Sequence, residues 1–164
     1  CIERNGDHRD LGSFPARRSS DRMFDAASFD GILHPRANQY VPCIQPVWNE
    51  CFRVLRKGGV LMSSFFNPAV FIADRDPRFA EQGLIRPCFR IPYSDLKDLS
   101  EKDMAKKLAR NEPMIFGHGL QGQIGGQLTA GFVLAGFLEE MHPAPRFEIE
   151  KYMPSVIATR SVKR

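Results

Sequence analysis

The stretch SFDGILHPRANQYVPCIQPVWNECFRVLRKGGVLMSSFF, residues 28–66, decides the fold of this chain. Its first apolar run, residues 28–33, is short and ends at a His-Pro pair, which predicts a strand. Apolar residues then recur at helical spacing over residues 44–55, and the Gly58-Gly59 pair predicts the end of that helix. Residues 60–66 predict a buried strand. A strand, a helix and a second strand at these spacings form a βαβ crossover, so we expect a parallel sheet.

The rest of the chain divides into a loose middle and a regular end. Five prolines interrupt residues 67–119, which include a charged helix predicted at 100–110, with Ser100 as its N-cap. A later helix is predicted at about 120–130, with one face made by Leu120, Ile124 and Leu128. Two strands, residues 132–138 and 155–162, follow and are expected to pair antiparallel.

Composition narrows the class of protein. The chain has 164 residues, 43% of them hydrophobic, which favours one folded domain over disorder. Its net charge of +4 is spread along the chain, so we expect no nucleic-acid partner. The charge-free stretch at 113–138 holds seven of the thirteen glycines, so we expect no membrane span. Four cysteines without metal-ligand spacing predict no metal site and a reducing, cytoplasmic setting.

The string GHGLQG, residues 117–122, has the spacing of a dinucleotide-binding fingerprint, with Glu139 about 20 residues later. A dinucleotide-binding domain that uses Gly117–Gly122 therefore stays as an alternative. The apolar run before this string is only three residues long, and two further glycines interrupt the helix after it. Fewer than 30 residues follow Glu139, which is too short for the rest of a doubly wound fold.

Three motifs occur in order at short spacings: NGDHRDL at 5–11, SFDGIL at 28–33 and RVLRKGGVL at 53–61. In this order the sequence resembles the class I S-adenosylmethionine-dependent methyltransferases, with Lys57 where that family usually has proline. The segments HPRAN at 34–38 and QIGGQLTAGF at 123–132 are similar to a bacterial subgroup of the family.

The resemblance implies an α/β fold, an incomplete Rossmann-like sheet that is mostly parallel and has an antiparallel C-terminal strand pair. Residues 1–66 would be the C-terminal part of the cofactor-binding core, 67–119 a substrate-cover insertion, and 120–164 the last core helix and the strand pair. The family's glycine-rich motif and second-strand acid belong before Asp7, where only six residues stand. We therefore expect a fragment of a longer methyltransferase that is inactive alone.

The resemblance also implies the cofactor site. Asp7 would receive the adenine amino group of S-adenosylmethionine, and His8 would line the adenine pocket. His34 and Pro35 would contact the cofactor at the carboxyl end of a central strand, where parallel α/β sheets bind ligands. From the residues alone, Asp7 is equally a turn former after Asn-Gly, and His34 can be a histidine that ends a strand.

On the substrate side, the resemblance makes Asn38 a hydrogen-bonding candidate and His118 a candidate base. The alternatives are that Asn38 caps a turn and that His118 is a surface histidine. The expected reaction is methyl transfer to a small-molecule acceptor that the sequence does not identify, and no catalytic residue is assigned. A non-catalytic interaction domain built on a partial methyltransferase fold is the other alternative. The oligomeric state is not predicted.

Overall fold

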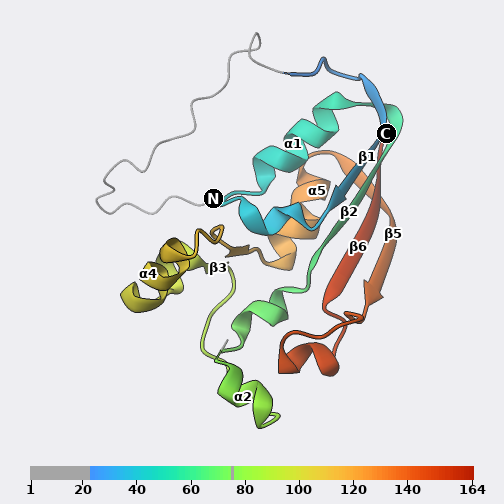
Figure 1. Cartoon of the computed structure of the whole chain (residues 1–164). Helices are drawn as coiled ribbons and strands as arrows, with labels where there is room; N and C mark the ends of the chain where they lie inside the picture. The colour runs from blue at the N-terminus through green and yellow to red at the C-terminus, as the bar shows by residue number, and fades with distance from the viewer. Residues whose placement is uncertain (1–22, 75) are drawn as a thin grey trace.

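The computed structural model describes residues 23–74 and 76–164 (Figure 1). Asp7 and His8, the residues predicted to contact the adenine, lie outside these residues. Strand β1 (Phe29–Pro35), helix α1 (Gln45–Val54) and strand β2 (Leu55–Phe66) follow one another along the chain. Strands β1 and β2 pair in parallel, with Ile32 opposite Leu61. The predicted βαβ crossover is therefore confirmed.

The helix ends earlier than the glycine pair indicates. Helix α1 stops at Val54 and β2 begins at once, so the prediction that Gly58-Gly59 ends the helix is wrong. Instead, Lys163 Nζ donates to the carbonyls of Phe52 and Leu55, each at 2.7 Å, and places a cation where the helix dipole is negative. The glycines lie in an irregular part of the β1–β2 ladder, where Gly58 has a φ of +82°.

The sheet is mixed, in the order β1-β2-β6-β5. Strand β6 (Val156–Lys163) runs antiparallel to β2 on one side and to β5 (Phe132–Glu140) on the other. The expected antiparallel C-terminal pair is therefore confirmed. The expectation of a mostly parallel sheet holds for the direction of β1, β2 and β5, but two of the three strand pairs within this four-stranded sheet are antiparallel. The reason is that β6 inserts between two strands of common direction.

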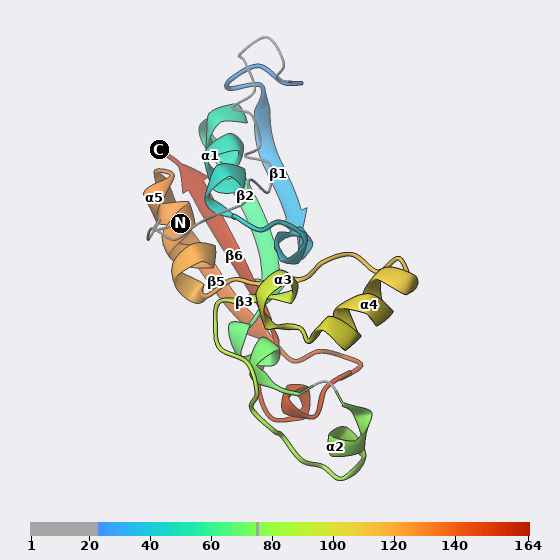
Figure 2. The same ribbon diagram turned by 90° about the vertical axis from the view of Figure 1, so that its left-hand side faces the viewer.

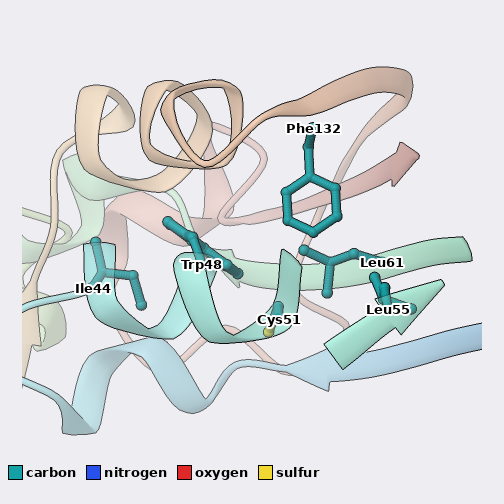
Figure 3. Close-up of a cluster of buried hydrophobic side chains, with 6 residues drawn as sticks. All are labelled: Ile44, Trp48, Cys51, Leu55, Leu61 and Phe132. Atoms are coloured by element: carbon teal, nitrogen blue, oxygen red, sulfur yellow. The ribbon is translucent and has the colours of Figure 1, made fainter. Parts of the chain in front are cut away.

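Helices α1 and α5 (Gly126–Thr129) lie on the same face of the sheet (Figures 1 and 2). One π-helical turn, Gln121–Gly125, leads into α5. Trp48 is fully buried between the helices and the sheet, at the centre of a cluster shown in Figure 3. The cluster consists of Ile44, Trp48, Cys51, Leu55, Leu61 and Phe132.

The late helix lies where the sequence predicts it, but its buried face differs. Leu120 and Leu128 are 47% and 50% exposed, whereas Gln123 and Gln127 are buried. The predicted apolar face of Leu120, Ile124 and Leu128 is therefore not the buried face of the helix. A Cβ on Gly126 would lie 2.7 Å from Trp48 Cδ1, so the helix approaches α1 on its glycine side and turns its glutamines toward the sheet.

Within residues 67–119, Phe71 and Tyr93 form a second, smaller cluster with Phe66, against which Phe89, Ile91 and Ile115 pack. Ser100 caps the charged helix by accepting from the Asp103 N–H at 3.1 Å, as predicted. The short elements of the chain are η2 (Ala37–Tyr40), η3 (Pro68–Ile72), α2 (Pro77–Glu81), β3 (Tyr93–Ser94), α3 (Asp95–Asp98), α4 (Glu101–Ala109), β4 (Phe116–Gly117) and η5 (Glu148–Lys151).

Neither α1 nor α5 covers the opposite face of the sheet. There the register places Leu33 beside Met62, and these side chains are 74% and 53% exposed. No helix within residues 23–74 and 76–164 is long and apolar enough to cross a membrane.

Candidate functional site

The site lies at the carboxyl end of β1, which ends at His34 and Pro35 (Figure 2). Arg36 follows with a φ of 47°, and the chain then enters the turn Ala37–Tyr40. His34 is half-buried and Pro35 is exposed. Open α/β sheets bind ligands outside the carboxyl ends of their parallel strands, so the structure presents these two residues at the expected edge.

A short chain of hydrogen bonds fixes the His34 ring. Asn38, only 1% exposed, donates from Nδ2 to Gln123 Oε1 at 2.5 Å. Asn38 Oδ1 lies 2.5 Å from His34 Nε2, and because this oxygen can only accept, Nε2 must carry the hydrogen. The ring also packs edge-on against Trp48, with centroids 5.6 Å apart. His34 is thus held in one orientation, and its Nδ1 is not part of this chain of bonds.

The buried glutamines extend this polar network to the sheet. Gln127 Nε2 donates to the Gln123 carbonyl at 3.0 Å and to Thr159 Oγ1 at 3.1 Å. Ser161 Oγ donates to Gln127 Oε1 at 2.7 Å. Buried amides are stabilising only when their donors and acceptors are paired. The network therefore fixes the late helix to β6 and, through Gln123, to the end of β1.

His118 reaches the same turn from the other side. Its Nε2 donates to the carbonyls of Val41 at 2.8 Å and Asn38 at 3.1 Å. Burial lowers the pKa of His118, and these two hydrogen bonds offset part of that shift. Nε2 is therefore occupied as a donor, and Nδ1 is the atom of this ring that could accept a proton.

The structure brings four of the predicted site residues to one edge: His34, Pro35, Asn38 and His118. Asn38, a hydrogen-bonding candidate on the substrate side, uses both polar atoms of its amide in bonds within the protein, to Gln123 and His34. The sequence motifs did not predict that Gln123 and Gln127 are buried. The spacing of Gln123 and Gln127 was the signal that could have found them, since residues four apart lie on the same face of a helix.

Two glycines of the fingerprint-like string, Gly117 and Gly122, take part in internal packing. A Cβ on Gly117 would lie 2.6 Å from Phe71 Cγ, and the Gly122 carbonyl accepts from Trp48 Nε1 at 2.9 Å. Strand β4, which precedes the helix, has two residues. Tight packing against aromatic rings accounts for Gly117, and the strand is too short for a nucleotide-binding βαβ unit.

A small cavity of about 10 Å³ lies beside the site, which is the space of one water molecule. Its lining combines polar and aromatic side chains: Arg36, Asn38, Gln39, Phe65, Phe66, Phe71, Phe116 and Gln123. Among the residues that the structure describes, no three His, Cys, Asp or Glu side chains gather as a metal site.

Comparison with known proteins agrees with this fold. No family model matches the chain. A Bacillus subtilis (strain 168) protein described as the uncharacterized methyltransferase YbaJ is 42% identical over 141 residues, which are 86% of this chain and 53% of that protein. Of the solved structures, an S-adenosylmethionine-dependent methyltransferase from Mesorhizobium loti superposes with a TM-score of 0.57 at 15% identity, covering 85% of this chain and 64% of that one. A Methanosarcina mazei S-adenosylmethionine-dependent methyltransferase gives a TM-score of 0.54 at 16% identity, covering 90% and 65%.

The fold is therefore that of the class I methyltransferases, and the chain is homologous to the S-adenosylmethionine-dependent methyltransferases. The chain spans about half of the length of the Bacillus subtilis protein.

Proposed function

We propose that this chain is part of an enzyme that transfers the methyl group of S-adenosylmethionine to a small-molecule acceptor. The observation that carries this proposal is the 42% identity to a methyltransferase over 86% of the chain. The grouping of His34, Pro35 and His118 at a ligand-binding edge of the sheet supports it.

The described residues fit one side of the cofactor only. His34 and Pro35 offer a ring and an apolar surface against which an adenine could pack. The amides of Asn38 and Gln123 are buried and bonded to each other, and Asn38 also bonds to His34, so neither amide faces ribose hydroxyls at the surface. Asp7 remains the predicted acceptor of the adenine amino group. We therefore expect these 164 residues alone to bind S-adenosylmethionine weakly or not at all.

When bound, the cofactor supplies a methyl group on a sulfonium, which is already activated for in-line displacement. The protein then needs to position the acceptor and exclude water. In our proposal the network of His34, Asn38 and Gln123 keeps this edge rigid, and residues 67–119 cover the acceptor. Where the acceptor loses a proton, His118 Nδ1 is the base candidate, because burial favours its neutral form.

A chimera tests the proposal. The part of the Bacillus subtilis protein outside the 141-residue match is joined to this chain, and S-adenosylmethionine binding is measured by calorimetry for the chimera and for the chain alone. We expect binding by the chimera only. The variant His34→Ala should weaken that binding, while His142→Ala, outside the site, should not. Micromolar binding by the chain alone would contradict its being a fragment.

A chimera that is folded by circular dichroism yet does not bind the cofactor would contradict methyl transfer. That result would favour the alternative, a non-catalytic interaction domain on a partial methyltransferase fold. Binding of a dinucleotide, lost on substitution of Gly119, would instead favour the nucleotide alternative. Gly119 is the appropriate position because a Cβ there meets nothing closer than 3.5 Å, so the substitution tests ligand contact without disrupting packing.

A further inference from the structure

Two arginine side chains converge on the ring of Phe66. Arg36 Cζ lies 5.8 Å and Arg146 Cζ lies 5.4 Å from the centroid of this ring. Phe66 is the last residue of β2, Arg36 follows β1, and Arg146 belongs to the connection between β5 and β6. Three segments that are distant in sequence thus gather two positive charges at the edge of the sheet where His34 lies.

The backbone on both sides of this arrangement is fixed. The Arg36 N–H donates to the Ser64 carbonyl at 2.7 Å. Arg36 has a φ of 47°, a backbone conformation that residues other than glycine rarely adopt. The Arg146 N–H donates to Glu150 Oε2 at 2.6 Å, and Glu150 is fully buried. Such anchoring reduces the conformational entropy lost when the guanidinium groups bind a ligand.

The aromatic base beneath the two arginines is also fixed. Phe66 is 7% exposed and packs edge-on against Phe71, with centroids 6.4 Å apart. A ring face attracts a guanidinium group through its quadrupole, so Phe66 holds both cations while leaving their N–H groups available.

Neither guanidinium group pairs with a carboxylate in the part of the chain that the structure describes. The nearest acidic contact of Arg146 is through its backbone, since Glu150 accepts from the main-chain N–H. Two exposed like charges beside one ring repel each other, and an anion between them relieves that repulsion. The planar fork of guanidinium N–H donors matches the oxygens of a carboxylate or a phosphate.

We infer that Arg36 and Arg146 bind an oxyanion group, a carboxylate or a phosphate, on the methyl acceptor. That this oxyanion belongs to the methyl acceptor rests on the proposed function, whereas anion binding beside Phe66 does not. Arg36 and Phe66 line the same small cavity as Asn38, and Asn38 bonds to both His34 and His118. The two arginines thus select an anionic acceptor and hold it at the edge where His34 and His118 lie.

The first experiment needs no cofactor. The full chain is titrated with phenyl phosphate, benzoate and benzyl alcohol, which share a ring and differ in charge, while NMR follows the arginine side-chain N–H signals. Phenyl phosphate or benzoate should shift the signals of Arg36 and Arg146, and benzyl alcohol should not. The stronger of the two anions identifies the oxyanion. Equal shifts with benzyl alcohol, or none with either anion, would overturn the inference.

Matched variants then locate the binding. Arg36→Gln and Arg146→Gln should each weaken anion binding about 10-fold or more, because each removes charge-assisted hydrogen bonds. Arg160→Gln makes the same charge change at an exposed position of β6 and should leave the affinity unchanged. An equal loss in Arg160→Gln would show a non-specific charge effect and refute the site. Anion binding without methyl transfer by the chimera would refute the proposed function and leave this site standing.

Discussion

The Asn38 side chain donates a buried 2.5 Å hydrogen bond to Gln123, a residue 85 positions further along the chain. Asn38 belongs to the turn after β1, and Gln123 to the helix that packs beside α1. This contact fixes the ligand-binding edge of β1 to the late helix. Because Gln123 then connects to Gln127, Thr159 and Ser161, the site shares its hydrogen bonds with the core.

Replacing Asn38 should therefore destabilise the whole fold. Asn38→Leu leaves Gln123 Oε1 buried without a donor, which should lower the free energy of unfolding by about 1–3 kcal/mol. Urea denaturation at pH 7 measures this change. Gln123→Leu should cost a similar amount, and the double variant should cost less than the sum, because one shared bond is lost. Asn49→Leu, at an exposed asparagine, is the control. A loss in Asn38→Leu no larger than in this control would contradict the role of the bond.

Alanine substitutions at the two neighbouring glycines of the late helix should change the stability of the fold in opposite directions. A Cβ on Gly126 would meet the fully buried Trp48 ring at 2.7 Å, so Gly126→Ala should destabilise the fold by about 1–3 kcal/mol. A Cβ on Gly125 meets nothing closer than 3.8 Å, and Gly125→Ala should stabilise by up to about 1 kcal/mol through helix propensity. Melting temperatures of the two variants test this ordering, and a stable Gly126→Ala would disprove the close approach of the two helices.

Stability should fall with acid because of His118. Its pKa is lowered in the folded chain, so below about pH 6.5 the unfolded state binds a proton more readily. The contribution of His118 is complete above that pH and is lost as the pH falls through the lower folded value. Urea midpoints at pH 7.5 and pH 5 should therefore differ less in His118→Gln than in the parent chain. The same change at His142 should keep the parent difference, and an unchanged slope in His118→Gln would refute the assignment.

Cys51 should be unreactive in the native chain. Burial raises the pKa of its thiol to about 11, and the negative charge of Glu50 adds to the shift. Iodoacetamide at pH 8, followed by peptide mapping, should label Cys51 only in denaturant, whereas the exposed Cys88 should be labelled in the native chain. Rapid native labelling of Cys51 would show that α1 separates from the sheet more readily than its packing indicates.

The sequence predicted those features that depend on neighbouring residues. Apolar periodicity located α1, β2 and the late helix, and Ser100 predicted a helix cap that the structure confirms. Local patterns suffice there because helical and strand periods appear directly in the spacing of apolar residues. The motifs also placed His34 at the end of a strand, which β1 confirms.

The tertiary structure decided what depends on contacts between distant residues. The end of α1 depends on Lys163, the buried face of the late helix on Gly126 against Trp48, and the orientation of His34 on Gln123. The sequence by itself determined the βαβ unit and the edge of the sheet where the site forms. Only the folded chain decided which polar groups are paired inside the protein. It also decided which charges, those of Arg36 and Arg146, stay available to a ligand. The reason is that partners far apart in sequence meet only when the sheet and its helices assemble.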